Sequence, residues 1–376
     1  MKIPFVNLHA RVREAGPELH VCFARLLERG QFILGEQVAS FEEEFARAMG
    51  ARYAVAVANG TDAIELSLRA ENIRRGSNEV LTSPLTASFT ALAILAAGSK
   101  PRFADIDPGT LLLDASDAGN RLTKRTGAIL PVHLYGQPCD LPRFASLARA
   151  ADMPLIQDAC QAHGARLGGK PFTSFSKCVA YSFYPTKNLG CLGDGGAILA
   201  NSSAVAGRLK MLRDGGRRGG HSSRIAGVNS RLDEIQAGFL RAFLPRLADW
   251  TEERRQLARI YEEQLGDCPG IQIVRHRPGS VYHLFVIRAR HRQRLRKHLA
   301  ERGIGAAIHY PVPLHLQSAF RECGLKRGDL PHAERACREI LSLPLWTGMT
   351  ETDVSKVADS VRTFSQHRTS AFSESR

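Results

Sequence analysis

Short apolar runs alternate, over the first part of the chain, with longer segments in which apolar residues recur every three or four positions. The short runs are typical of buried strands, and the longer segments are typical of amphipathic helices. Their alternation predicts a layered α/β domain with a mainly parallel sheet. The expected strands are residues 53–58, 79–83, 102–106, 128–134, 155–158, 179–184 and 197–200, and the expected helices are residues 61–70, 86–97, 141–151 and 203–213.

The pattern changes after residue 233. From there to about residue 265 the apolar positions keep a helical spacing, which predicts one long or kinked helix that joins two domains. Beyond it, an apolar run at 282–287, a basic helix and a second apolar run at 306–310 indicate a small α+β domain. We therefore expect a large domain at residues 1–245, a small domain at residues 246–364 and a polar, frayed tail at residues 365–376.

A chain of 376 residues can bury a large core without the support of metal ions or disulfides. Its eight cysteines are scattered, with no Cys-x-x-Cys pair, which favours free thiols in a reducing cytosol. The start of the chain lacks the charged and apolar segments of a signal peptide, and no apolar run approaches the roughly 18 residues of a membrane span. We expect a soluble cytoplasmic protein with no bound metal.

The chain has 51 Lys and Arg but only 37 Asp and Glu, and the resulting net charge of +14 raises the question of a nucleic-acid partner. The densest basic run, residues 288–298, has no interleaved aromatic residues for base stacking and is typical of the solvated face of a helix. We therefore expect no nucleic-acid partner. A metabolite that carries a diphosphate accounts for the same sign of charge.

Three short clusters carry candidate chemistry. In the first, residues 58–63, an apolar strand stops at Gly60 and a helix begins at Thr61. Such a turn directs backbone N–H groups and a helix N-terminus to one point, which suits a phosphate group. The same arrangement also occurs in ordinary strand-to-helix connections, so this cluster alone does not define a site.

In the second cluster, residues 155–164, Asp158 stands at the end of an apolar strand. A buried carboxylate is costly to ionise unless it meets a fixed positive partner, and a protonated pyridine nitrogen is such a partner. The alternative is that Asp158 caps a helix or pairs with an arginine.

In the third cluster, residues 181–190, Lys187 follows a strand and precedes the glycine-rich segment 193–197. A lysine in a mostly apolar turn can have a lowered pKa and form an imine with an aldehyde. Most lysines lie on solvated surfaces, but Pro185 and Leu189 beside Lys187 do not fit a solvated face.

The three clusters together supply a phosphate cup at Gly60 and Thr61, an acid for a ring nitrogen and a lysine for a Schiff base, which are the parts that pyridoxal 5′-phosphate requires. With these residues the sequence resembles the DegT/DnrJ/EryC1/StrS family of sugar aminotransferases. Further matching segments, in family order, are Phe-Ile-Leu-Gly at 32–35, Gly-Val-Asn-Ser-Arg-Leu-Asp-Glu-Ile-Gln-Ala at 227–237, His-Tyr-Pro at 309–311 and Ser-Leu-Pro-Leu at 342–345.

The resemblance implies fold type I of the pyridoxal-phosphate enzymes: a large domain with a mixed, mostly parallel seven-stranded sheet flanked by helices, and a small C-terminal α+β domain. It implies that Lys187 forms the Schiff base and then shuttles the proton, and that Asp158 keeps the ring nitrogen protonated. By the same resemblance, the remaining cofactor contacts are Gly60, Thr61, Gln161 near the ring oxygen, Ser182 and, from the partner subunit of a homodimer, Asn229, while His309 and Tyr310 reach the sugar.

One position departs from the family pattern. Family members place an aromatic residue over the cofactor ring, but the matching position here is Ala87, and Phe89 follows two residues later. We therefore assign no stacking residue.

The substrate implied by the resemblance is a nucleotide-linked 3-keto-6-deoxysugar. Tyr184 and the Gly-Asp-Gly-Gly segment at 193–196 are more similar to the branch that aminates C3 than to the branch that aminates C4. The amino donor implied by the family is glutamate. A 4-keto sugar, a keto-cyclitol or a non-catalytic regulatory role remain as alternatives, whereas Lys187 argues against the dehydratases of this fold, which have histidine at that position.

Overall fold

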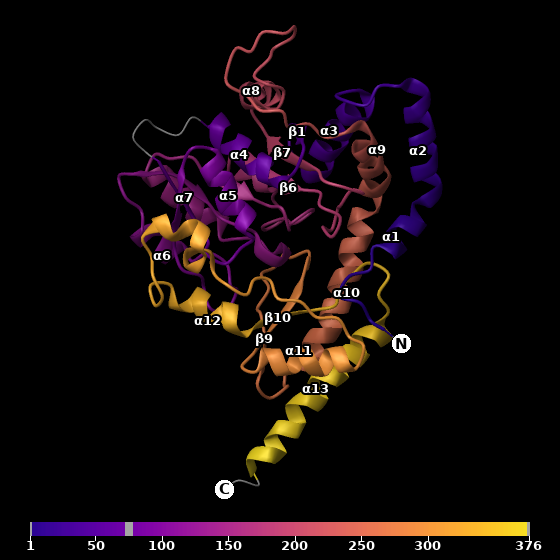
Figure 1. Cartoon of the computed structure of the whole chain (residues 1–376), viewed down its shortest axis with the longest axis vertical. Coiled ribbons are helices and arrows are strands. Elements are labelled where there is room, and N and C mark those ends of the chain that lie inside the picture. The colour runs from indigo at the N-terminus through magenta and orange to yellow at the C-terminus, as the bar shows by residue number, and fades with distance from the viewer. Residues whose placement is uncertain (1, 72–77, 374–376) are drawn as a thin grey trace.

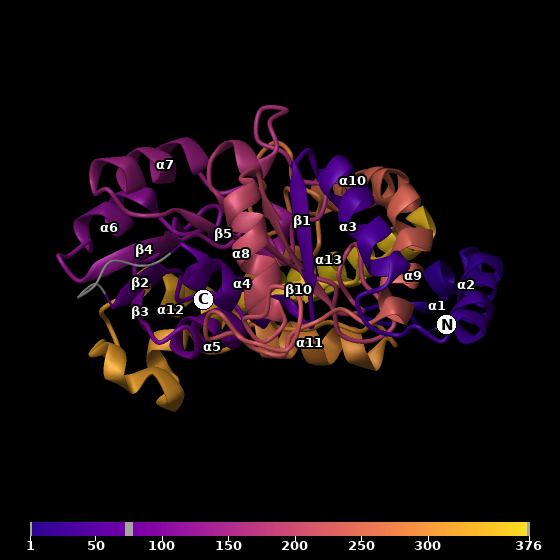
Figure 2. The same ribbon diagram turned by 90° about the horizontal axis from the view of Figure 1, so that it is seen from above.

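The computed structural model describes residues 2–71 and 78–373, and a large mixed sheet lies at its centre with helices on both faces (Figures 1 and 2). Its strands are β1 (Tyr53–Val57), β2 (Glu79–Thr82), β3 (Lys100–Phe103), β4 (Thr126–Leu130), β5 (Ile156–Asp158), β6 (Cys178–Ser182) and β7 (Gly196–Ala200). Parallel bridges from Ile129 to Leu155 and from Val132 to Asp158 join the sets β3-β2-β4 and β5-β6-β7-β1. Since only β7 pairs antiparallel among these strands, with β6 and β1, the expected seven-stranded, mostly parallel sheet is confirmed.

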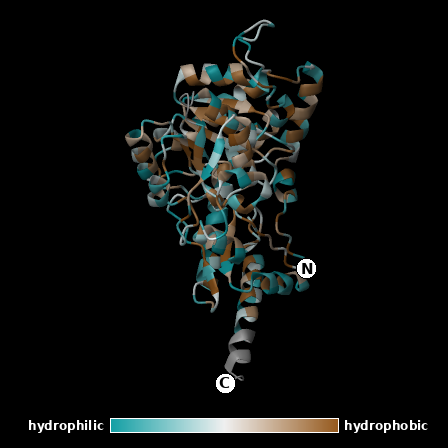
Figure 3. Ribbon diagram, turned by 60° about the vertical axis from the view of Figure 1, so that its left-hand side comes forward, coloured by the Kyte–Doolittle hydropathy of each residue, from teal (hydrophilic) through white to brown (hydrophobic). Residues whose placement is uncertain are grey.

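Helices on the two faces of the sheet bury two separate apolar cores. Figure 3 shows hydrophobic residues gathered around the central strands. Because successive strand side chains point to opposite faces, Val55 and Val57 of β1 join the core beneath α4, while Ala54 and Ala56 join the core beneath α3. The helices in this part of the chain, through the one that follows β7, are α1 (His9–Glu14), α2 (Gly16–Arg29), α3 (Glu36–Met49), α4 (Gly60–Ala70), α5 (Ser88–Ala96), α6 (Ala115–Asn120), α7 (Leu141–Ala150) and α8 (Ser203–Arg213), with 3₁₀ turns η1 (Leu134–Gly136) and η2 (Phe172–Ser174).

Each strand of the large sheet differs from its expected range by at least one residue, and two of them differ most. β3 begins before Pro101 rather than at residue 102, and proline is tolerated there because β3 lies at the edge of the sheet. β4 ends at Leu130 rather than at residue 134. Shortly after it the chain enters η1, in which Tyr135 has a φ of 61°, a left-handed conformation that a strand cannot contain.

The long apolar pattern after residue 233 forms two helices, α9 (Glu234–Phe243) and α10 (Leu247–Leu265). The turn η3 (Leu244–Arg246) separates them and contains Pro245, which cannot supply the backbone N–H that a continuous helix requires. The expected kinked helix is therefore confirmed. It runs from the large sheet to the other end of the molecule (Figure 1).

Glu234, the first residue of α9, fixes this helix to α3. The N-cap of α3 is Gly35, which has no side chain to satisfy the first amides of the helix. The Glu234 carboxylate instead accepts the N–H groups of Gly35 at 2.9 Å, Gln37 at 2.8 Å and Val38 at 2.8 Å. The start of one helix therefore caps the start of another that is distant in sequence.

The small unit is built on the antiparallel sheet β8 (Ile271–Ile273), β9 (Phe285–Ala289) and β10 (Ile340–Leu343), in the order β10-β9-β8. β9 begins three residues later than expected because Tyr282 has a φ of 43°. The expected strand at 306–310 is reduced to one bridge, between Ala307 and Ser342. Helices and turns of this part are α11 (Arg292–Glu301), η4 (Leu314–Leu316), η5 (Ser318–Cys323), α12 (Pro331–Glu339) and α13 (Glu351–Ser373).

Some of the chain after residue 245 packs on the large sheet. Phe320 of η5 contacts Phe103 of β3 edge to face, with ring centroids 6.4 Å apart. Asp105 accepts the N–H groups of His332 at 2.9 Å and Ala333 at 2.8 Å, at the start of α12. The division at residue 245 stays a prediction, and these contacts hold the two parts together next to the carboxyl ends of the strands.

The C-terminal segment differs from the expected frayed tail. α13 continues to Ser373, because residues 365–373 contain no glycine or proline to end the helix, and residues 374–376 lie outside the described residues. Within the described ranges, no helix is long and apolar enough to cross a membrane.

Candidate active site

The N-terminus of α4 forms a cup with the end of β6. The side chain of Asn59, the N-cap of α4, accepts the N–H of Asp62 at 2.9 Å, while helix geometry leaves the N–H groups of Gly60 and Thr61 without intrahelical acceptors. A Cβ atom on Gly60 would lie 2.6 Å from Cβ of Ser182 and 3.0 Å from Sγ of Cys160. Gly60 therefore allows Ser182 to lie directly against the helix start, and the structure brings these predicted phosphate contacts together.

Asp158 ends β5 and is only 4% exposed. Its Oδ2 accepts the hydroxyl of Thr90 at 2.8 Å, and its Oδ1 accepts the N–H of Cys160 at 3.1 Å. Donors of this kind stabilise a charged carboxylate. In the described part of the chain Asp158 forms no ion pair and caps no helix, so the alternative roles that its sequence position left open are not realised.

Thr90 is a site residue that the sequence did not reveal. It lies in the first turn of α5, and its Oγ1 is 3.2 Å from Oγ1 of Thr86, which stands in the bend before the helix. Only the folded chain shows that Thr90 meets Asp158.

Lys187 lies in the turn that follows β6, and its N–H bonds to the carbonyl of Tyr184 at 2.8 Å. Burial lowers the pKa of Lys187, while the nearby acidic groups of Cys160 and Asp158 act to raise it. A lowered pKa increases the fraction of neutral amine near pH 7, and the neutral amine is the form that attacks an aldehyde. The charge of Asp158 acts on Lys187, which agrees with the predicted placement of the acid and the lysine in one site.

Gln161 links the site to the loop of His309 and Tyr310. Its Oε1 accepts the N–H of Tyr135 at 2.7 Å, and its Nε2 donates to the Tyr310 hydroxyl at 3.3 Å. The hydroxyl of Tyr135 donates to the carbonyl of His309. All three predicted residues, which come from both parts of the chain, are therefore joined by hydrogen bonds.

Three histidines around Lys187 are held neutral. Burial lowers the pKa of His163 to about 3 and that of His309 to about 4, and it lowers the pKa of His283 well below the usual value. The positive charge of Lys187 contributes to each of these shifts. Around neutral pH these rings thus add no positive charge to the site. His283 was not among the predicted residues.

Two expected features, the phosphate contact of Asn229 and an aromatic residue over the cofactor ring, are not found within the described residues of one chain. Asn229 is exposed, although the next residue, Ser230, is buried and accepts the N–H of Ala58 at 3.1 Å. No described contact brings the Asn229 side chain to the cup of its own chain. Ala87 is the N-cap of α5, and Phe89 is 62% exposed, so the stacking position stays unassigned.

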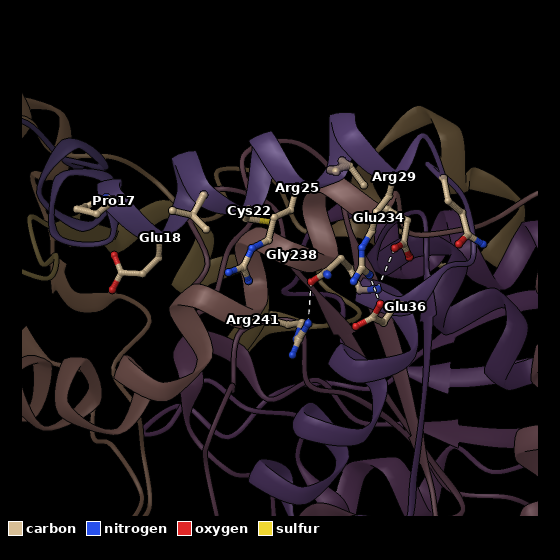
Figure 4. A pocket seen from close by; sticks show the side chains of 13 residues that line it. Pro17, Glu18, Cys22, Arg25, Arg29, Glu36, Glu234, Gly238 and Arg241 are labelled. Atoms are coloured by element: carbon tan, nitrogen blue, oxygen red, sulfur yellow. Dashed lines mark hydrogen bonds and ion pairs between the residues drawn. The ribbon is translucent and has the colours of Figure 1, made fainter.

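A cavity of about 520 Å³ between α2, α3 and α9 is separate from this site (Figure 4). Charged residues of both signs line it, and the predicted site residues are not among them. The labelled charged residues in Figure 4 are Glu18, Arg25, Arg29, Glu36, Glu234 and Arg241.

The residues present fit pyridoxal 5′-phosphate, since the tight cup at Gly60, the buried acid Asp158 and the half-buried amine Lys187 suit its phosphate, ring nitrogen and aldehyde. The sheet order and this site define a pyridoxal-phosphate-dependent transferase of fold type I. The chain belongs to the DegT/DnrJ/EryC1/StrS aminotransferase family, whose sequence profile matches residues 16–362.

Relatives cover nearly the whole chain. It is 40% identical to the dTDP-3-amino-3,4,6-trideoxy-alpha-D-glucose transaminase of Streptomyces venezuelae, over 97% of each chain. It is 37% identical to a protein of Geobacillus stearothermophilus named pleiotropic regulatory protein, over 98% of this chain and 100% of the relative. Among solved structures, S. venezuelae DesV in complex with a ketimine intermediate superposes with a TM-score of 0.94 at 39% identity, over 97% of this chain and 98% of DesV.

Proposed function

We propose that this aminotransferase moves an amino group from glutamate to the C3 keto group of a nucleotide-linked 6-deoxyhexose. The observation that carries the proposal is the meeting of Asp158 and Lys187 in a chain whose full-length relatives include dTDP-3-amino-sugar transaminases from S. venezuelae and Aneurinibacillus thermoaerophilus. Tyr184 and Asp194 support the same branch of the family. The excess of positive charge agrees in sign with a sugar diphosphate.

The side chains divide the work as follows. Pyridoxal phosphate would supply an electron sink when bound, and Asp158, which accepts hydrogen bonds from Thr90 and the N–H of Cys160, would hold the proton on its ring nitrogen. Lys187 holds the cofactor and, once its amine is released, carries a proton between the reacting carbon atoms. Gly60, Thr61 and Ser182 bind the phosphate.

His309 and Tyr310 contact the sugar in this proposal. Burial raises the pKa of Tyr310 to about 12, so its hydroxyl stays protonated and can donate to a sugar oxygen. His309 is neutral and is oriented by Ser342, whose Oγ lies 2.9 Å from its Nδ1. Neutral donors and acceptors of this kind bind sugar hydroxyl groups without repelling either charge state of Lys187.

We further propose that the enzyme acts as a cytoplasmic homodimer in which Asn229 completes the phosphate cup of the partner subunit. The exposure of Asn229 in a segment anchored by buried Ser230 supports this arrangement, because the side chain is free to meet a second copy.

A second candidate function is regulatory, since two relatives are named as a pleiotropic regulatory protein and a sensory transduction protein. The lowered pKa of Lys187 favours catalysis, because a regulator has no need of a half-buried amine beside an acid.

Replacement of the lysine separates the two functions. Lys187→Ala should lose the covalent link to the cofactor and essentially all transamination, while pyridoxal phosphate still binds through its phosphate. Borohydride treatment followed by mass analysis of the intact chain measures the link. Lys170→Ala, at an exposed lysine, is the matched control and should keep both link and activity. Full activity of Lys187→Ala would rule out the assignment.

The sugar is tested with the pyridoxamine form of the enzyme. A panel of 3-keto and 4-keto nucleotide sugars is added, and recovery of the pyridoxal absorbance identifies the amino acceptor. We expect fast recovery with a 3-keto-6-deoxyhexose linked to dTDP. Faster recovery with a 4-keto sugar would move the enzyme to the other branch, and recovery with a keto-cyclitol alone would exclude nucleotide sugars.

A further inference from the structure

The turn that carries Lys187 is held by a buried arginine from the start of the chain. Arg11 belongs to α1 and is only 6% exposed. Its guanidinium donates to the carbonyl oxygen of Lys187 at 2.8 Å, to that of Asn188 at 3.3 Å, and to that of Pro185. One side chain therefore gathers three carbonyl groups of a single turn.

Arg11 has no carboxylate within ion-pairing distance in residues 2–71 and 78–373. Its guanidinium lies 5.6 Å from the ring centroid of Trp250 and 5.8 Å from that of Phe243. A buried cation is costly, and the turn carbonyls and aromatic faces are the groups that compensate for it here. If Arg11 only covered the two aromatic rings, an apolar residue would do so without the free-energy cost of burying a charge. The contacts with the three carbonyl groups are therefore the reason to expect a specific role for Arg11.

The other side of the turn is held as well. Nδ2 of Asn188 donates to the carbonyl of Val281 at 2.9 Å, and Oδ1 of Asn188 lies 3.2 Å from Nδ1 of His283. The residue after Lys187 is thus attached to the segment that leads into β9. The backbone of Lys187 is therefore held from both sides.

We propose that Arg11 is a positioning residue for Lys187: by fixing the carbonyl groups of Pro185, Lys187 and Asn188, it sets the approach of the lysine amine to the cofactor aldehyde. This inference rests on the proposed role of Lys187 as the residue that carries the cofactor. It assigns to an N-terminal residue a part in cofactor attachment without contact with the cofactor itself.

The test separates covalent attachment of the aldehyde to Lys187 from non-covalent binding of the ring and phosphate. Full-length apoprotein is titrated with pyridoxal 5′-phosphate, which can link to Lys187, and with pyridoxine 5′-phosphate, which has the same ring and phosphate but no aldehyde. In Arg11→Lys and Arg11→Gln, the rate of borohydride-fixed attachment should fall by about tenfold to a hundredfold, the scale of a small misplacement of a reacting group. The affinity for pyridoxine 5′-phosphate should change by no more than about twofold, which is well under the tenfold change that corresponds to about 1.4 kcal/mol of binding free energy.

Arg292→Lys is the matched control. Arg292 is also a buried arginine, 8% exposed, and it donates to the backbone carbonyls of Cys337 and Ile340 in the small unit. Its replacement removes a similar buried arginine without touching the turn of Lys187. We expect attachment and pyridoxine 5′-phosphate binding to stay as in the unaltered chain.

Three results would overturn the inference. Attachment at the normal rate in both Arg11 variants would show that the turn needs no clamp. An equal loss of attachment and of pyridoxine 5′-phosphate affinity would assign Arg11 to the whole site, and failure of both variants to fold, with Arg292→Lys folded, would assign it to stability alone. Failure of the proposed function is distinguishable, since Lys187→Ala would then still form the borohydride-fixed link.

Discussion

Asp158 shows how single contacts set the chemistry of the site. Its two carboxylate oxygens each accept one hydrogen bond, from Thr90 or from the N–H of Cys160, and no basic side chain of the described residues pairs with it. The carboxylate thus remains available to the positive ring nitrogen of the cofactor.

Asp158→Asn should lower turnover by orders of magnitude at saturating pyridoxal phosphate. The amide carries no charge to stabilise the protonated ring, and loss of one preorganised electrostatic partner has effects of this size. Steady-state kinetics with the identified sugar measures the effect. Asp114→Asn is the control, because Asp114 caps α6 and asparagine caps a helix equally well. A near-normal rate in Asp158→Asn would contradict the role.

The buried histidines predict a dependence of stability on pH. His163 has a folded pKa of about 3, well below its unfolded value of about 6.5, so the unfolded chain binds more protons between these values. The free energy of unfolding should therefore be unaffected by this group above pH 6.5 and fall as the pH drops below it. For His163 alone the loss at pH 5 is about 2 kcal/mol.

Urea unfolding at several pH values measures this loss. His163→Phe places an apolar ring beside Tyr181 and Phe183 and should flatten the dependence between pH 6.5 and 5. An unchanged slope in this variant would show that His163 is not a source of the acid sensitivity.

The residues that the sequence revealed are those whose meaning is local. Gly60, Asp158 and Lys187 each stand at the end of an apolar strand, and the pattern on either side is enough to mark them. Thr90 and Arg11 act across 68 and 176 residues of chain, and neither sits in a segment with an unusual composition. Their roles follow from packing that only the fold defines.

At the level of elements, boundaries were less well predicted than elements themselves. All seven strands of the large sheet were expected, but Pro101 lies inside β3 and Tyr282 interrupts the expected start of β9. Both deviations depend on tertiary position: an edge strand tolerates proline, and a left-handed residue is stable where neighbouring contacts hold it. The pattern of apolar residues contains neither piece of information.

The cap that Glu234 forms on α3 should be a major source of stability for the helical layer. Glu234→Ala leaves one buried and two partly buried amides without their acceptor and should lower the free energy of unfolding by about 3 kcal/mol. Chemical denaturation measures the change. Glu36→Ala, in the first turn of the same helix, removes an exposed glutamate that pairs with Arg29 and should cost under about 1 kcal/mol. Equal costs for the two variants would disprove the cap.

At the level of the whole molecule, the number of chains in the active enzyme is to be measured by experiment. The mostly parallel seven-stranded sheet of fold type I was implied by family resemblance and is confirmed, whereas the order of its strands does not follow from apolar patterns and the division into two domains stays a prediction. Association of two chains depends on surface residues. In the proposed dimer, the exposed Asn229 is the residue that reaches the partner's phosphate cup.

Asn229→Ala should weaken binding of pyridoxal phosphate by about tenfold or more without unfolding the chain, because a charge-assisted hydrogen bond is worth roughly 1.5–3 kcal/mol. If the contact crosses subunits, a mixture of Lys187→Ala and Asn229→Ala chains contains one intact site per heterodimer. We expect the mixture to regain activity at limiting cofactor, where each parent is low. Absence of recovery, with heterodimers confirmed by mass, would place Asn229 in its own subunit's site or outside it.

The pairing of β5 with β6 has a consequence for how such enzymes diversify. Asp158 and Ala180 are partners in register on neighbouring parallel strands, so the acid and the turn of Lys187 leave the same edge of the sheet. The turn at residues 167–170, which lies between them in the chain and includes no predicted site residue, can therefore gain or lose length over evolution without moving the acid relative to the lysine. The chemistry can be inherited unchanged while this turn varies.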